Sequence, residues 1–243
     1  MALSEDFSTL ANQAADDVPP LGSLHATLGQ ARAALPRVDN VGRTGDASNG
    51  YVVIDRVVAD LRQAFPESLC APGCGRCCQM HRALIRVYRS EWEPVVDHLL
   101  TWPTDRFQGL VAAFYQAYDP YLDRLHALQA SLDRHERPAV TEAELPVSCP
   151  MLVAGSCSVY PVRPAICRGY GHFELTNDTG DRTDIFACPA QRDVLQAQLE
   201  PMPGVRIRLP TFNPFYQAIA DVCDGEEKLL IPLWFERTFP RPV

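Results

Sequence analysis

Hydrophobic residues recur at intervals of three and four positions between Tyr51 and Phe65, a spacing that predicts an amphipathic helix ended by Pro66. Two more helices are predicted over Asp105–Tyr118 and Tyr121–Arg134, with Asp119-Pro120 breaking the path between them. The apolar residues of these two runs form a stripe typical of core packing. Its members are Phe107, Leu110, Val111, Phe114, Tyr118, Leu122, Leu125, Leu128 and Leu132.

Shorter patterns predict the remaining elements. Ala83–Tyr88 is typical of a strand, and Ser90 with Glu93 forms a capping box for a helix that extends to Leu100. Met151–Tyr160 predicts a β-hairpin that turns at Gly155-Ser156. Further predictions are helices at Leu21–Leu35, Cys188–Leu199 and Asn213–Cys223, a strand at Val205–Leu209, and an aromatic tail from Lys228 that folds back over the domain.

The chain divides by composition into an arm and a domain. Residues 1–50 are rich in Ala, Asp, Gly and Pro, which favours a mobile N-terminal arm with a linker at Asp39–Gly50. Residues 51–243 are expected to form the folded domain with a C-terminal extension, and 47% hydrophobic and 21% charged residues are ordinary for a globular chain. The pattern predicts an α+β fold: a predominantly α-helical single domain with short hairpins around a cysteine-rich metal core.

Charge and segment lengths exclude several classes of partner. A net charge of −8 argues against nucleic-acid binding, which needs clustered Lys and Arg. The start of the chain, Met1–Phe7, lacks the basic and apolar regions of a secretory signal. The apolar stretch Leu229–Phe235 is far shorter than the roughly 20 residues that span a bilayer. We therefore expect a cytoplasmic protein without a membrane partner.

Nine cysteines carry the chemistry of this sequence. An odd number fits a complete disulfide framework poorly, and in a reducing compartment clustered cysteines bind metal more often than they pair. Cys74-x2-Cys77 lets two thiolates bind one metal from a single turn. Cys223, alone in an apolar helix, is expected to fill the core. The eight candidate metal ligands are Cys70, Cys74, Cys77, Cys78, Cys149, Cys157, Cys167 and Cys188.

The adjacent pair Cys77-Cys78 restricts how these ligands are shared. Neighbouring side chains on an extended backbone point to opposite faces, and a disulfide between them would close a strained small ring. The two cysteines should therefore face different metals, or one of them is not a ligand. The favoured interpretation is two neighbouring sites that share this loop. His81 and His172 could each replace a thiolate, although a hydrogen-bonding or surface role is favoured for both.

The two motifs resemble a known family. The pattern Cys70-x3-Cys74-x2-Cys77-Cys78, followed by Cys149-Pro-x-Leu-x2-Gly-x-Cys157 and Arg163-Pro-x2-Cys167-Arg168, is similar to the YkgJ-type cysteine-cluster family over about Cys70–Cys188. The resemblance implies a zinc- or iron-chelating domain, with zinc or an iron–sulfur cluster such as [4Fe–4S] as cofactor. Relatives that share the cluster include flagellin lysine methylases. The first three cysteines also resemble the cluster motif of radical S-adenosylmethionine enzymes, but Arg76 stands where those enzymes usually carry an aromatic residue.

Two functions follow as hypotheses. The first is a metal-binding protein that holds zinc or an iron–sulfur cluster in a structural or electron-transfer role. The alternative is an iron–sulfur metalloenzyme that acts in redox chemistry or protein modification. In either case Arg163 and Arg168, which bracket Cys167, are expected to donate hydrogen bonds to the cofactor's sulfur ligands, unless they form surface ion pairs instead. No catalytic residue, substrate or redox partner is predicted.

Overall fold

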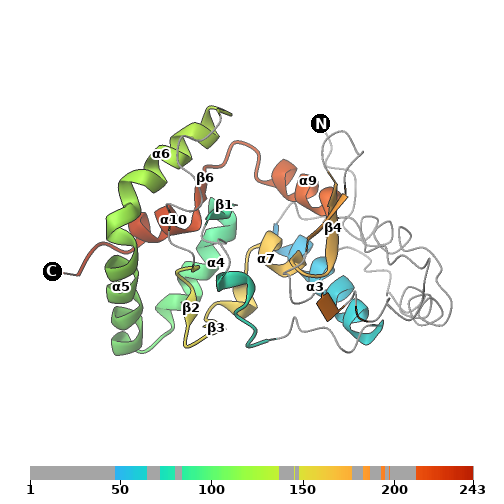
Figure 1. The fold of residues 1–243 in the computed structure, drawn as a ribbon, viewed down its shortest axis with the longest axis horizontal. Coiled ribbons are helices and arrows are strands. Elements are labelled where there is room, and N and C mark those ends of the chain that lie inside the picture. The colour runs from blue at the N-terminus through green and yellow to red at the C-terminus, as the bar shows by residue number, and fades with distance from the viewer. Residues whose placement is uncertain are drawn as a thin grey trace. The chain divides into compact units, whose positions relative to one another are not determined.

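The described part of the protein is mainly helical, with a few short antiparallel strand pairs (Figure 1). A computed structural model describes residues 47–64, 72–79, 84–136, 145, 148–176, 183–186, 193–194, 197 and 212–242. The chain divides into two compact units, Met1–Ala71 with Pro164–Asp224 (the first unit) and Pro72–Arg163 with Gly225–Val243 (the second unit). The predicted domain 51–243 spans both units, whereas the predicted arm lies outside the described residues up to position 46.

The first unit is built on the predicted helix near residue 51. This helix, α3, spans Ala47–Ala64, so the prediction is confirmed except that residues 47–50 are helical rather than linker. The other elements of the unit are α7 (Ala165–Gly169), β4 (Phe173–Thr176), β5 (Thr183–Phe186) and α9 (Asn213–Val222), with β4 and β5 antiparallel. The fully buried rings of Phe173, Phe212 and Phe215 pack together, and Cys223 is buried in the core as predicted. The helix and strand predicted at 188–199 and 205–209 fall largely outside the described residues.

The second unit contains the predicted long helices and the cysteine-bearing hairpin. Asp119-Pro120 lies in a short 3-10 turn between α5 (Thr104–Tyr118) and α6 (Leu122–Asp133), as the break in the pattern predicts. Strand β1 (Arg86–Tyr88) pairs antiparallel with β6 (Lys228–Leu230), placing Val87 opposite Leu229. The elements are η1 (Cys77–Gln79), β1 (Arg86–Tyr88), α4 (Arg89–Leu100), α5 (Thr104–Tyr118), η3 (Asp119–Tyr121), α6 (Leu122–Asp133), β2 (Leu152–Val153), β3 (Ser156–Cys157), η5 (Tyr160–Val162), β6 (Lys228–Leu230) and α10 (Ile231–Thr238).

Helix α4 is capped differently from the prediction. The helix begins one residue before Ser90, and the backbone N–H of Tyr88 donates to the Glu91 carboxylate at 3.1 Å. The N–H of Ser90 instead donates to the carboxylate of Glu226 at 2.9 Å. The predicted capping box of Ser90 and Glu93 is therefore wrong. Glu91, in the first turn of α4, supplies the carboxylate that accepts the N–H of the residue before the helix, Tyr88.

The hairpin predicted at Met151–Tyr160 is confirmed, with its turn one residue earlier than expected. Leu152 pairs with Cys157 and Val153 with Ser156, so Ala154 and Gly155 form the two-residue turn. Their φ angles are 48° and 77°, and two positive φ angles are what a type I′ hairpin turn requires. Glycine therefore occupies the second turn position rather than the first.

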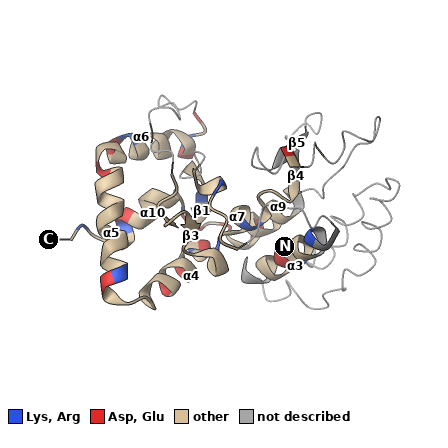
Figure 2. Cartoon of the chain, turned by 60° about the horizontal axis from the view of Figure 1, so that its bottom comes forward, with Lys and Arg blue, Asp and Glu red and all other residues tan. Residues whose placement is uncertain are grey.

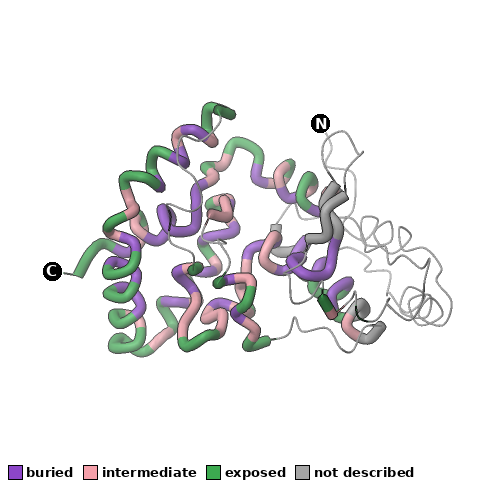
Figure 3. Tube along the Cα trace, in the orientation of Figure 1, coloured by how far each residue is buried: buried purple, intermediate pink, exposed green. Residues whose placement is uncertain are grey.

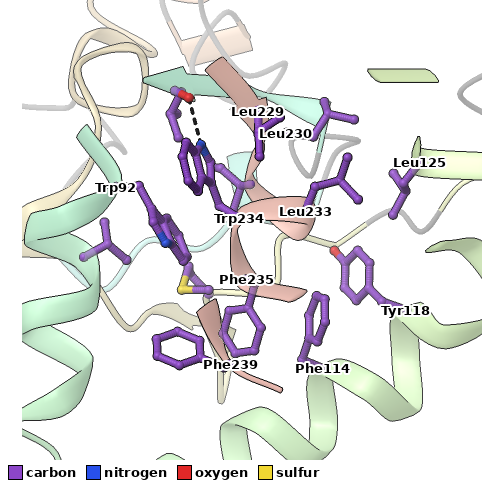
Figure 4. Close-up of a cluster of buried hydrophobic side chains, with 14 of the residues drawn as sticks. Trp92, Phe114, Tyr118, Leu125, Leu229, Leu230, Leu233, Trp234, Phe235 and Phe239 are labelled. Atoms are coloured by element: carbon purple, nitrogen blue, oxygen red, sulfur yellow. Dashed lines mark hydrogen bonds between the residues drawn. The ribbon is translucent and has the colours of Figure 1, made fainter. Parts of the chain in front are cut away.

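The C-terminal segment lies at the centre of the second unit's core, which confirms that the aromatic tail folds back (Figure 4). Phe235 is fully buried, with ring centroids 4.3 Å from Phe114 and 4.9 Å from Phe239. The indole N–H of Trp234 donates to the Val87 carbonyl at 2.9 Å. Figure 3 shows the result as burial along most of α10 and along one side of α5. The two halves of the unit, far apart in sequence, thus share one hydrophobic core.

Figure 2 shows Lys and Arg interspersed with Asp and Glu on the described helices. None of the helices within the described ranges is long and apolar enough to cross a membrane.

Candidate metal centre

The first cysteine loop, residues 72–79, packs closely against the β2–β3 hairpin. Gly75 is buried, and a Cβ atom placed on it would lie 2.6 Å from the Leu152 Cδ1 atom and 2.9 Å from the Gly155 carbonyl carbon. Such distances are too short for any side chain. The Ser156 hydroxyl donates to the Gly73 carbonyl at 3.1 Å. Glycine at position 75 therefore permits the loop to approach the hairpin that carries Cys157.

Backbone hydrogen bonds add Cys149 to the same place. The N–H of Cys149 donates to the Cys78 carbonyl at 2.6 Å, which joins the two predicted motifs directly. The Cys149 carbonyl accepts the N–H of Leu152 at 3.0 Å, so the residue leads into strand β2. Met151 between them is buried, and its carbonyl accepts both the N–H and the hydroxyl of Ser158.

Three thiols gather around that of Cys78. This buried side chain forms hydrogen bonds with the thiols of Cys149, Cys157 and Cys77. Its Sγ atom lies 4.0 Å from that of Cys77. The thiol hydrogen bonds and then burial raise the pKa of Cys78 well above its ordinary value. The Cys78 thiol therefore holds its proton more firmly than an exposed cysteine does.

Cys157 has the opposite tendency. A hydrogen bond from the Cys78 thiol, a backbone N–H at Val159 and the positive charge of Arg163 lower the pKa of Cys157 from 9.0 to about 7, against the effect of burial. The guanidinium of Arg163 is held by the Tyr160 carbonyl at 2.9 Å and lies 3.5 Å from the centre of the Tyr160 ring. The positive charge of Arg163 thus acts on the Cys157 thiol. The hydrogen bonds predicted from Arg163 and Arg168 to the sulfur ligands of a cofactor stay a prediction.

The adjacent cysteines do not sit on extended backbone. Cys77 and Cys78 begin the 3-10 helix η1, and their sulfurs lie 4.0 Å apart. The expectation that their side chains point to opposite faces is therefore wrong, since a helical turn brings them together. The reason for assigning the two cysteines to different metals no longer applies.

The other predicted site residues have different positions. Cys74 lies half-buried in the loop 72–79, and Cys167 lies half-buried on α7 of the first unit. Arg168 is buried, forms an ion pair with Asp55, and has its guanidinium 4.7 Å from the Tyr51 ring centre. It therefore helps to pack α7 on α3, through an ion pair in which the arginine is buried and the aspartate is exposed. His172 is buried in the first unit, whereas Cys70, His81 and Cys188 are outside the described residues.

Tyr118 is a site residue that the sequence did not single out. It was assigned to the core stripe, and it is indeed 3% exposed, but its hydroxyl donates to the Ser148 carbonyl immediately before Cys149. Burial, and then the nearby Cys149 thiol, raise the pKa of Tyr118 above its ordinary value. One feature of the sequence could have indicated this role, namely a tyrosine within an apolar stripe. A buried tyrosine hydroxyl usually has a hydrogen-bond partner.

Within the described ranges, no group of three or more His, Cys, Asp or Glu side chains is placed so that it could hold a metal ion as it stands. The thiols around Cys78 are instead linked to it by hydrogen bonds. Their chemistry nevertheless suits a soft or borderline metal ion, which binds thiolates and displaces their protons.

Comparisons of the chain with protein-family models, curated proteins and solved structures find no match. The similarity to the YkgJ-type family stays a prediction from the two motifs.

Proposed function

We propose that the protein binds a metal ion through Cys77, Cys78, Cys149 and Cys157, with Zn²⁺ in a structural role. The observation that carries the proposal is the contact of the buried Cys78 thiol with three other thiols. Four thiolates are one of the usual donor sets of a structural zinc site. A metal here would join the loop 72–79 to the segment that follows Ser148 and to the hairpin.

The spacing of the sulfurs supports one metal rather than a cluster. Sulfurs bound to one zinc at about 2.3 Å in tetrahedral geometry lie about 3.8 Å apart. The 4.0 Å between the sulfurs of Cys77 and Cys78 is close to that value. In a four-iron cluster each cysteine binds a different iron, which separates the sulfurs further. We therefore assign both adjacent cysteines to the same ion.

The protonation of the group also supports a cation. Four adjacent thiolates repel one another, so in the metal-free protein the Cys78 proton is retained while Cys157 loses its own near neutral pH. A divalent cation would displace the remaining protons, and Arg163 would offset part of the negative charge. Cys70, Cys74, Cys167 and Cys188 stay predicted metal ligands on the sequence alone, with no metal assigned to them.

The test is metal analysis of the full chain purified without oxygen or chelators. The wild-type protein should carry stoichiometric zinc. Cys78→Ala should lose about one zinc per chain, because a structural zinc site needs all four of its protein ligands. Cys223→Ala is the matched control, since this cysteine is also buried but lies in the core of the first unit. That variant should keep the wild-type metal content.

Two outcomes contradict the proposal. One is wild-type protein without stoichiometric metal, and the other is Cys78→Ala with an unchanged metal content. If the purified protein instead contains iron and inorganic sulfide and absorbs broadly in the visible range, the cofactor is an iron–sulfur cluster and not zinc. An iron–sulfur cluster is the cofactor of the enzymatic alternative.

A further inference from the structure

Tyr118 reaches the cysteine group from the end of helix α5. Its side chain is buried, and its ring stacks on Phe114 with centroids 4.9 Å apart and planes inclined by 15°. The hydroxyl donates to the Ser148 carbonyl. Packing therefore fixes the position from which the hydroxyl acts.

The carbonyl of Ser148 and the N–H of Cys149 belong to one peptide group. A trans peptide is planar, and its C=O and N–H point in opposite directions. One end of this group accepts the Tyr118 hydroxyl, and the other donates to the Cys78 carbonyl at 2.6 Å. Rotation of the peptide would break both hydrogen bonds. The orientation of the peptide group that places the Cys149 Cα atom is thus set from both sides.

We propose that Tyr118 is a positioning residue for the metal site, holding the Cys149 thiol toward Cys78 through the shared peptide group. The inference rests on the proposed function. A hydroxyl bonded to the carbonyl also polarises the peptide and strengthens its N–H as a donor. Tyr118 therefore acts through Cys149 and Cys78 without contacting the metal itself.

The same helix supplies a matched control. Tyr115 is buried, and its ring contacts Phe114 with centroids 5.1 Å apart. Its hydroxyl donates to the Phe239 carbonyl at 2.8 Å, in the C-terminal segment. Tyr115→Phe and Tyr118→Phe thus each remove one buried hydroxyl bonded to a backbone carbonyl, and only the second removes a bond beside a cysteine.

The experiment measures Zn²⁺ affinity of the full chain by competition with a chromophoric chelator, together with thermal unfolding of the metal-free protein. Tyr118→Phe should weaken zinc binding about tenfold, as loss of a residue that orients a ligand typically does. Tyr115→Phe should lower thermal stability to a similar degree and change zinc affinity by less than about twofold, because its hydrogen bond supports folding alone. The visible spectrum of bound Co²⁺ should shift only in Tyr118→Phe.

Equal zinc affinities for the two variants would overturn the positioning role while leaving the proposed function intact. A wild-type chain that binds no zinc would overturn both. If Tyr118→Phe does not fold, amide exchange in the wild-type protein decides the question. Zinc should slow exchange of the Cys149 N–H, since the metal and the hydroxyl fix the same peptide group, and unchanged exchange contradicts the inference.

Discussion

Substitution of Gly75 by alanine should separate the first cysteine loop from the hairpin. The added methyl would lie 2.6 Å from Leu152 Cδ1 and 2.9 Å from the Gly155 carbonyl carbon, with the Gly155 oxygen closer still. Normal carbon contacts begin at about 3.5 Å, so the loop must withdraw by roughly 1 Å. The leucine can rotate, but the Gly155 backbone is held in the hairpin turn. The displacement would therefore fall on the loop that carries Cys77 and Cys78.

The magnitude follows from two terms. Overpacking at a close contact costs about 1–3 kcal/mol. Withdrawal would also lengthen the 3.1 Å bond from Ser156 to the Gly73 carbonyl, and a net hydrogen bond contributes about 0.5–1.5 kcal/mol. A loss of about 2 kcal/mol for the docked loop corresponds to roughly 30-fold weaker zinc binding.

Chelator competition and urea unfolding, each with and without zinc, would measure this loss. Gly109→Ala is the chemical control, because nothing lies within 4 Å of a Cβ atom there and the residue is helical. That substitution should leave zinc affinity unchanged and hold or raise stability, as alanine favours a helix over glycine. Wild-type affinity and stability in Gly75→Ala would refute the close packing of loop and hairpin.

Two further outcomes are expected. In metal-free protein, the rate at which iodoacetamide alkylates Cys157 should rise with pH with a midpoint near pH 7. Cys78→Ala should move this midpoint toward pH 9.0, because it removes the thiol hydrogen bond. A midpoint near pH 9.0 in the wild-type protein contradicts that hydrogen bond. Because folding lowers this pKa, Cys157 stabilises the metal-free fold above pH 9.0, and that contribution declines as pH falls to about 7. Phe235→Ala should destabilise the second unit by about 3–5 kcal/mol in denaturant unfolding, while Leu100→Ala, 62% exposed, should change stability by less than about 0.5 kcal/mol; similar losses in both would contradict the described core.

Helix periodicity was sufficient to predict most of the described helices. The apolar repeat between residues 51 and 65 gave α3, and the stripe on α5 and α6 gave much of the second unit's core. These predictions succeed because burial of one helix face depends on spacing within the helix itself. The partner of strand β1 was not predictable, since Val87 pairs with Leu229 from a distant segment and nothing local to either strand specifies the other.

The candidate site was predictable in composition and not in geometry. The motifs identified Cys77, Cys78, Cys149 and Cys157 as ligand candidates, but an assumed extended backbone separated the first two. The 3-10 turn depends on how the loop packs through Gly75, a tertiary contact. The role of Tyr118 depends likewise on the placement of Ser148 beside helix α5. Contacts between segments distant in sequence decide both features.

The second unit is assembled from two stretches separated by Pro164–Asp224, and this order matters during synthesis. Cys78, Cys149 and Cys157 leave the ribosome well before Trp234 and Phe235, around which their supporting core closes. When a domain needs its C-terminal residues to fold, its N-terminal residues stay exposed to solvent for seconds while the rest of the chain is synthesised. The nascent thiols therefore pass through an interval in which oxidants or stray metal ions can reach them, and a reducing environment would protect them until helix α10 is in place.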